Sequence, residues 1–460
     1  MSTVHGPAMS PFKTAAVLLS LLVCVLAAPV SGAATHVGGP ISVNTTWTLA
    51  NSPYVIDSGV TVNAGVTLTI EPGVVVKGSG GDRWIQVLGT LSASGTIAAP
   101  IYFTSLADDT VGGDTNGDGS ATSPARGDWS GLGFRSGSTG NVLAYVTVRY
   151  AGNVDWGYYH NGGIYTEVSA VSLSHGTVSD NAGHGIRTSG NAAPAVTDSA
   201  FLRNQSWAIY CDGVDCTTAT HQRNTASSNG ANGVRVAGTL DANATWEDTL
   251  PFAIEGGVGV ATGVTLTIAP GVVVKGMDPS AYLIVSGSLH ADATGQAPTV
   301  FTSFLDDTAG GDTNGDGSAS TPARGGWAGI AFWAGSSGNV LANATVRYGG
   351  GRDWGYYHNA PIYTQVSGLT VDHVTVIHGL QDGLSVAGSA APLVTNCTFT
   401  DNSRWAVYLD DPDCMAGGMR GNAAAAEIRL ILRDFELEAL ARLGELLRGT
   451  CATVAAAEPR

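Results

Sequence analysis

The stretch Asn181-Ala-Gly-His-Gly-Ile186 decides the fold, together with two segments that follow it, Phe201-Leu-Arg-Asn204 and Trp207-Ala-Ile-Tyr210. Equivalent positions recur after 23 residues, so that Asn204 follows Asn181 and Ile209 follows Ile186. A repeat of about that length predicts a β-solenoid, in which each coil pairs its backbone with the coils on either side. We therefore expect the two asparagines to stack along a turn and the two isoleucines to stack in the interior.

Short strands are predicted throughout the chain by apolar residues that alternate with small or polar ones. Such a period of two suits a strand with one buried face, whereas a helix would spread the same residues around its surface. The triplets that carry this alternation are Val60–Val62, Leu68–Ile70, Val74–Val76, Ile85–Val87, Ile101–Phe103 and Val146–Val148.

The sequence also contains an internal duplication. The block Gly65-Val-Thr-Leu-Thr-Ile-Glu-Pro-Gly-Val-Val-Val-Lys-Gly78 returns 198 residues later as Gly263–Gly276, with Ala269 in place of Glu71. The same offset relates Trp129 to Trp327, and a single-residue gap is needed upstream of Tyr54. We predict two tandem copies, 35–237 and 238–422, that form one continuous solenoid.

Composition limits the classes of function. Glycine supplies 63 of 460 residues, about twice its usual share, and predicts many turns. The net charge of −16 argues against a nucleic-acid binder, because no basic surface is available to neutralise phosphates.

Both ends differ from the repeats. Residues 1–34 combine Lys13, an apolar run over 15–28 and the small residues Ser31–Ala34, which predicts a secretory signal rather than a membrane anchor. We expect no membrane span after its cleavage, because no later segment is long and apolar enough. Residues 423–460 predict an amphipathic α-helix, read as a cap on the open end of the solenoid. A docking helix for a partner and a non-native reading frame are the alternatives.

The Leu-Thr-Ile-x-Pro-Gly-Val-Val-Val-Lys block and the Asn/Gly-Ile coils resemble secreted bacterial right-handed parallel β-helix repeat proteins of the pectin-lyase-like fold. The resemblance covers about 41–422. It implies an all-β, right-handed parallel β-helix located outside the cell or at its surface. It says little about activity, since that scaffold carries lyases, glycosidases, adhesins and structural fibres.

An acidic loop, Asp108–Ser120, lies between two predicted strands and returns as Asp306–Ser318. Its core, Asp114-x-Asn116-x-Asp118-Gly119, matches the first half of an EF-hand loop, whose alternate oxygens converge on calcium. Ala125 and Ala323 stand where the closing Glu of an EF-hand would be, so the loop is more similar to the calcium loops of dockerin or thrombospondin repeats. The predicted ligands are Asp108, Asp109, Asp114, Asn116, Asp118 and Ser120, and Asp306, Asp307, Asp312, Asn314, Asp316 and Ser318. The alternative is an acidic turn that caps its own backbone and is neutralised by Arg126 or Arg324.

An aromatic segment, Asp155-Trp-Gly-Tyr-Tyr-His-Asn161, recurs as Asp353–Asn359. Aromatic faces beside amide and hydroxyl groups suit sugars, so the segment is a candidate site for polysaccharide. The alternative is that these rings fold back and seal the solenoid. The candidate ligand-binding residues are Trp156, Tyr158, Tyr159 and His160, and Trp354, Tyr356, Tyr357 and His358.

Cysteine spacing predicts a disulfide between Cys211 and Cys216 in an oxidising compartment, with free thiols as the alternative. Three further cysteines, Cys397, Cys414 and Cys451, have no predicted pairing.

The sequence offers a weak case for catalysis. His175, Asp180, His184 and Arg187 are the candidate groups in the first copy, but the second copy does not repeat the arrangement, which favours ordinary turn residues. We therefore expect a secreted, calcium-stabilised β-helix with a binding or structural task and polysaccharide as its partner. A polysaccharide lyase or glycosidase of the same fold is the alternative.

Overall fold

The computed structural model describes residues 34–424, with the exception of 82, 154–160, 356–358, 412 and 415–417. Nearly all of the predicted signal lies outside these residues, as does the predicted C-terminal helix beyond residue 424. Among the described residues, no helix is long and apolar enough to cross a membrane.

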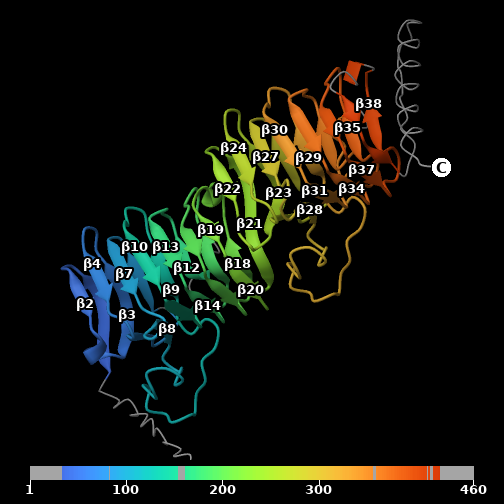
Figure 1. Ribbon diagram of the computed structural model, residues 1–460. Helices are drawn as coiled ribbons and strands as arrows, with labels where there is room; N and C mark the ends of the chain where they lie inside the picture. Colours follow the sequence, from blue (N-terminus) through green and yellow to red (C-terminus); the bar gives the residue numbers. More distant parts are fainter. Residues whose placement is uncertain are drawn as a thin grey trace, which may run out of the picture. The chain divides into compact units, whose positions relative to one another are not determined.

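The described chain is an all-β solenoid of parallel strands, consistent with a β-helix (Figure 1). Most coils contribute one short strand to each of three rows, and all strand pairs within the described residues are parallel. Short 3₁₀ helices interrupt the strands, among them η1 (Leu49–Asn51) and η2 (Val214–Thr218).

In the first copy the first and second rows both include the long strand β3, and the third row begins at β2. The first row is β1 (Thr35–Ile41), β3 (Tyr54–Val62), β5 (Val75–Gly78), β8 (Ile101–Ser105), β11 (Val146–Arg149), β14 (Thr177–Ser179), β17 (Ala200–Leu202) and β20 (Thr225–Ser227). The second row is β3, β6 (Trp84–Val87), β9 (Gly131–Phe134), β12 (Gly162–Thr166), β15 (His184–Thr188), β18 (Trp207–Tyr210) and β21 (Ala231–Leu240). The third row is β2 (Thr45–Trp47), β4 (Thr67–Ile70), β7 (Thr90–Ser94), β10 (Asn141–Ala144), β13 (Val171–Ser174), β16 (Ala195–Thr197) and β19 (His221–Gln222).

The second copy repeats the plan from the β21–β23 pair onward. Its first row is β23 (Phe252–Val260), β25 (Val273–Gly276), β28 (Thr299–Ser303), β31 (Ala344–Arg347), β34 (Thr375–Ile377), β37 (Thr398–Thr400) and β40 (Ala423–Ala424). Its second row is β23, β26 (Tyr282–Val285), β29 (Gly329–Phe332), β32 (Ile362–Thr364), β35 (Leu384–Val386) and β38 (Val407–Leu409). Its third row is β22 (Ala244–Trp246), β24 (Thr265–Ile268), β27 (Ser288–Asp292), β30 (Asn339–Ala342), β33 (Leu369–Asp372), β36 (Leu393–Thr395) and β39 (Met419–Arg420).

The core follows from the period of two that the sequence contains. In β4, for example, Leu68 and Ile70 are buried while Thr67 and Thr69 face outward and are half-buried. The predicted interior stack is confirmed, because Ile186 pairs in register with Ile209 and both side chains are buried. Burial of each such side chain contributes about 1.5–3 kcal/mol.

Asparagine side chains connect the coils at one turn, as predicted. The Asn181 amide nitrogen donates to Oδ1 of Asn204 at 2.8 Å, and Asn204 in turn donates to Oδ1 of Asn229 at 2.9 Å. All three are buried, so each amide satisfies a polar group that would otherwise be left without a partner.

Candidate metal centre

Each acidic loop leaves the solenoid directly after a first-row strand, β8 in the first copy and β28 in the second (Figure 1). The first Asp of each loop is fully buried. Asp108 accepts hydrogen bonds from Thr104 and Thr110 and pairs with Arg149 at 2.5 Å, and Asp306 pairs with Arg347 at 2.6 Å. These contacts hold the start of the loop against the neighbouring strand, so Asp108 and Asp306 act as anchors for it.

A buried lysine holds the next part of each loop by hydrogen bonds to backbone carbonyl oxygens. The Lys77 ammonium donates to the carbonyl oxygens of Asp108 at 2.9 Å and Gly113 at 2.7 Å. Lys275 repeats these contacts with Asp306 and Gly311, both at 2.9 Å. Burial lowers the pKa of both lysines, that of Lys275 to about 8, against the attraction of the nearby aspartates. Sequence reasoning missed these residues, although a lysine at the end of the run Val74-Val-Val76 in both copies was a usable signal.

Three carboxylates gather farther along each loop. Asp109, Asp114 and Asp118 each bring an oxygen to within 4.8 Å of the others, and Asp307, Asp312 and Asp316 do the same. One oxygen in each cluster, Oδ1 of Asp109 or of Asp307, is buried and has no hydrogen-bond donor. Burial raises the pKa of Asp307, and the negative charges of Asp312 and Asp316 raise it further. The clusters therefore concentrate negative charge with one buried oxygen left unsatisfied.

Backbone amides shape the centre of the loop, as the alternative of a self-capping turn predicts. Asp114 accepts from the amides of Gly117 at 2.8 Å and Gly119 at 2.9 Å. Both glycines have positive φ, +73° and +74°, which a residue with a β-carbon adopts only with strain. Capping and metal binding are compatible here, since a carboxylate oxygen can accept more than one contact.

Two arginines were expected to neutralise the loops if these were only self-capping turns, but both side chains bind groups outside the loops. Arg126 donates to the carbonyl oxygen of Arg203 at 2.7 Å, and Arg324 pairs with Asp401 at 2.5 Å. The negative charge of the carboxylate clusters is therefore not balanced by these two side chains.

The two predicted asparagine ligands contact the carboxylates. The amide nitrogens of Asn116 and Asn314 donate to Asp118 and Asp316, each at 2.9 Å. Oδ1 of Asn314 is buried without a donor, which adds an unsatisfied oxygen to the second loop. Ser120 and Ser318 follow at the exposed end of each loop.

Most of the aromatic candidate site, Trp156, Tyr158, Tyr159, His160, Tyr356, Tyr357 and His358, lies outside the described residues. Trp354 is described and is only 7% exposed. Its ring packs on Ala328, Ala331 and Tyr363, and its Nε1 donates to the carbonyl oxygen of Ala360 at 3.1 Å. At this position the aromatic segment covers the outer face of the second row, as the sealing alternative predicts.

The groups considered for catalysis are held by neighbours. Asp180 pairs with Arg203 at 2.7 Å, and His175 stacks on Tyr145 with ring centroids 4.6 Å apart. Arg187 pairs with Asp212 at 2.5 Å and lies 3.8 Å from the ring centroid of Tyr210. His184 lies against the same ring, at 4.5 Å between centroids. These contacts are typical of structural residues on the outside of a solenoid.

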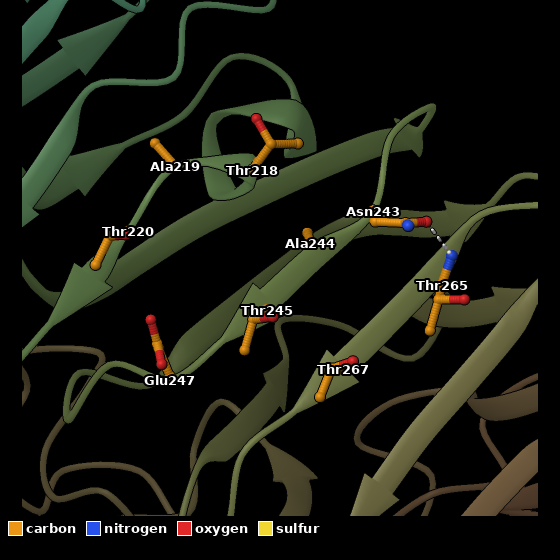
Figure 2. Close-up of a pocket in the computed structure, with 9 residues that line it drawn as sticks. All are labelled: Thr218, Ala219, Thr220, Asn243, Ala244, Thr245, Glu247, Thr265 and Thr267. Carbon is orange, nitrogen blue, oxygen red and sulfur yellow. Dashed lines mark hydrogen bonds between the residues drawn. The ribbon is translucent and has the colours of Figure 1, made fainter.

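A polar pocket of about 440 Å³ lies where the third row of the first copy meets that of the second (Figure 2). Five threonines, Asn243 and Glu247 dominate its lining; the threonines are Thr218, Thr220, Thr245, Thr265 and Thr267. Asn243 fixes one side by accepting a hydrogen bond from the Thr265 amide at 2.8 Å. The pocket presents hydroxyl groups and one carboxylate.

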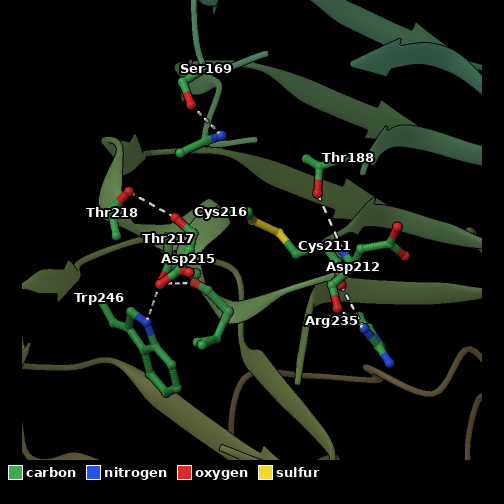
Figure 3. Close-up of a disulfide and its surroundings, with 12 residues drawn as sticks. Ser169, Thr188, Cys211, Asp212, Asp215, Cys216, Thr217, Thr218, Arg235 and Trp246 are labelled. Carbon is green, nitrogen blue, oxygen red and sulfur yellow. Dashed lines mark hydrogen bonds between the residues drawn. A yellow bond between two sulfur atoms is a disulfide. The ribbon is translucent and has the colours of Figure 1, made fainter. Parts of the chain in front are cut away.

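Cys211 and Cys216 form a disulfide, with Cα atoms 5.9 Å apart, beside η2 (Figure 3). Thr217 in the same turn accepts a hydrogen bond from Nε1 of Trp246 at 2.9 Å, which ties this insertion to the first strands of the second copy. Cys397 and Cys414 are free and buried, and Cys451 lies outside the described residues. Burial raises the pKa of Cys397 to about 11, so this thiol is a poor nucleophile.

The strand pairings and the loops define a class, a duplicated parallel β-solenoid with an acidic loop in each copy. No family model, curated protein or solved structure matches the chain.

Proposed function

We propose that the protein is a secreted, calcium-stabilised right-handed β-helix, related in fold to pectin-lyase-like proteins, with a binding or structural task. The observation that carries this proposal is the recurrence, in both copies, of three converging carboxylates beside a buried oxygen that lacks a donor. Capping alone would leave that oxygen without a partner, whereas a cation would satisfy it.

Calcium is the metal that this donor set suits best. Calcium takes six to eight oxygen ligands at 2.3–2.6 Å and tolerates irregular geometry, whereas magnesium requires near-octahedral coordination. Asp109, Asp114, Asp118 and the Asn116 side-chain oxygen supply donors in the first loop, with water and backbone carbonyls such as that of Ser120 available for the rest. A bound cation would remove the repulsion among the carboxylates.

Thermal unfolding with calcium and with EDTA tests the proposal. Calcium should raise the melting temperature and EDTA should lower it. Asp114→Asn and Asp312→Asn should each remove part of the calcium effect, since each disables one loop. Asp57→Asn is a matched control, because Asp57 is an exposed acidic residue outside both loops. Melting temperatures that respond to neither calcium nor EDTA would refute the calcium site.

Polysaccharide is the ligand class that we propose for the binding task, with the pocket of Figure 2 as its site. The volume of about 440 Å³ falls within the ~300–1,000 Å³ typical of ligand sites. Threonine hydroxyls, an amide and a carboxylate can pair with sugar hydroxyls, which require both donors and acceptors.

Retention on insoluble glycans tests this assignment. Replacing Thr245 and Thr267 by valine should reduce retention. The same change at Thr46 and Thr69 should not, because these residues occupy the aligned positions of the first copy, where the described residues form no wall like that of Thr218–Thr220. Equal retention of both double variants would exclude the pocket.

The alternative function, that of a polysaccharide lyase or glycosidase, is distinguished from binding by the products that it would form. Unsaturated products that absorb in the ultraviolet would identify a lyase, and new reducing ends alone would identify a hydrolase. Retention without product supports the binding proposal.

A further inference from the structure

Strand pairing is interrupted where the two copies meet. The first row of the first copy ends at β20, which pairs with β17 and with no other strand of the described chain. The third row ends at β19, and a separate sheet begins at β22. The copies are joined through the long strand β21, which pairs with β18 of the first copy and with both halves of β23, Val234–Val236 against Phe252–Ile254 and Gly238–Leu240 against Val258–Val260. Strand pairing between the copies therefore depends on the single strand β21, whereas β19 and β20 have no partner strand in the second copy within the described residues.

The acidic loop of the second copy lies across this interruption. The Asn232 backbone amide donates to the carbonyl oxygen of Thr313 at 2.8 Å, and its side-chain amide donates to the carbonyl oxygen of Asp312 at 2.8 Å. The ring of Phe304, at the base of the loop, stacks on Trp207 with centroids 5.7 Å apart. Gly310–Asp312 also face β20 across a pocket of about 420 Å³. The loop of one copy thus docks on the last coils of the other.

Asn232 is also the last member of the asparagine ladder of the first copy. Its Oδ1 accepts from the backbone amide of Asn229 at 3.1 Å and from the side-chain amide of Asn229 at 2.9 Å. Hydrogen bonds therefore connect the buried ladder, through one side chain, to the backbone of Asp312. Asp312 is one of the three carboxylates of the second cluster.

Among the described residues, no contact of the first acidic loop corresponds to these. The residue aligned with Asn232 is Ala33, which has no side-chain amide, and the residue aligned with Phe304 is Leu106. Thr313 is fully buried, whereas its counterpart Thr115 is half-buried. Oδ1 of Asn314 is buried without a donor, whereas Asn116 is exposed. Within residues 34–424 as described, the second loop thus makes contacts to preceding coils that have no counterpart at the first loop.

We infer that the second acidic loop is a clamp that holds the two copies together where strand pairing is interrupted, and that Asn232 positions this loop for its cation. The calcium part of this inference rests on the proposed function, and the docking of the loop does not. Because a preorganised site loses less conformational freedom on binding, the second loop is the tighter of the two calcium sites. Calcium bound there stiffens the junction between the copies.

Calcium titration calorimetry on the whole protein tests the inference. The wild type should show two sites of unequal affinity, and Asp312→Asn should remove the tighter one. Asn232→Ala should weaken the tighter site about tenfold, the effect of losing one to two ordinary hydrogen bonds, and leave the weaker site unchanged. Phe304→Leu, which installs the residue of the first copy, is a milder variant that should act in the same direction if Asn232→Ala does not fold.

Hydrogen exchange supplies the second readout. Removal of calcium should speed exchange of residues 225–236 in the wild type, and Asn232→Ala should abolish this calcium dependence. Absence of any calcium binding would refute the proposed function, and faster exchange at 310–316 in Asn232→Ala would then still support the docking of the loop. Two equal sites that neither variant changes, with unaltered exchange at the junction, would overturn the inference.

Discussion

Single buried polar residues set the conformation of the acidic loops. The ammonium groups of Lys77 and Lys275 donate hydrogen bonds to carbonyl oxygens of the loops. Asp108 and Asp306 form ion pairs with arginines on the next strand of their row. Removal of one partner from a buried ion pair costs about 3–5 kcal/mol, because the other charge remains buried. The loops are therefore fixed at their base by buried hydrogen bonds and ion pairs.

The buried imidazole of His221, at the start of β19, predicts a dependence of stability on pH. Burial lowers the pKa of His221, and the nearby Asp248 carboxylate opposes that shift only in part. An unfolded histidine takes up a proton as the pH falls through about 6.5, whereas His221 in the folded state resists protonation. The unfolded state then binds more protons, so the free energy of unfolding decreases as the pH falls from 7 toward 5.

His221→Met provides the comparison, because the second copy carries Met419 at the aligned position. Urea unfolding at several pH values should give a shallower loss of stability toward pH 5 for the variant than for the wild type. Parallel pH profiles would contradict the assignment of this loss to His221.

At the scale of elements, the local sequence pattern was sufficient to predict the strands but not the contacts that the loops make. Alternation in triplets such as Leu68–Ile70 predicted strands that the structure contains, because the period of two is a property of neighbouring residues. The stack of Asn181 and Asn204 was predictable from their spacing for the same reason. Asp108 was grouped with the metal ligands, and its anchoring role depends on Arg149, 41 residues away, which no local pattern indicates. The contact between Asn232 and Asp312, 80 residues apart, was likewise beyond reach of the sequence.

The asparagine ladder leads to a prediction about the two copies. Asn204 is buried and bonds to Asn181, Asn229 and the Val178 carbonyl oxygen. Asn402, its counterpart in the second copy, is half-buried and contacts the Gly379 amide and the Val376 carbonyl oxygen. Asn204→Ala should lower the free energy of unfolding by about 3 kcal/mol and Asn402→Ala by about 1 kcal/mol, in proportion to the buried groups left unsatisfied. Urea unfolding of both variants checks this, and equal losses would mean that the ladder adds nothing beyond single hydrogen bonds.

At the scale of the whole molecule, duplication has produced two copies that are not equivalent. The second copy begins on a strand provided by the first, β21, and its acidic loop rests on the first copy. The first copy has no preceding coil of this kind within the described residues. Two nearly identical loop sequences therefore occupy different surroundings, which is the physical basis for expecting different affinities.

The excess of acidic residues requires that specific calcium binding be separated from general screening. With a net charge of −16, any salt should relieve some repulsion. Raising NaCl from about 0.1 M to about 1 M shortens the Debye length from ~10 Å to ~3 Å, and should raise the melting temperature of the wild type and of an Asp114→Asn, Asp312→Asn double variant alike.

Calcium at about one hundred times its dissociation constant adds about 2.7 kcal/mol per site, and should act on the wild type far more than on the double variant. Magnesium should not replace calcium, because the loops offer irregularly arranged carboxylate and carbonyl oxygens rather than an octahedral cage. If magnesium or NaCl reproduced the full calcium effect, or if the double variant retained it, the stabilisation would arise from charge neutralisation over the whole surface and the two loops would not be calcium sites.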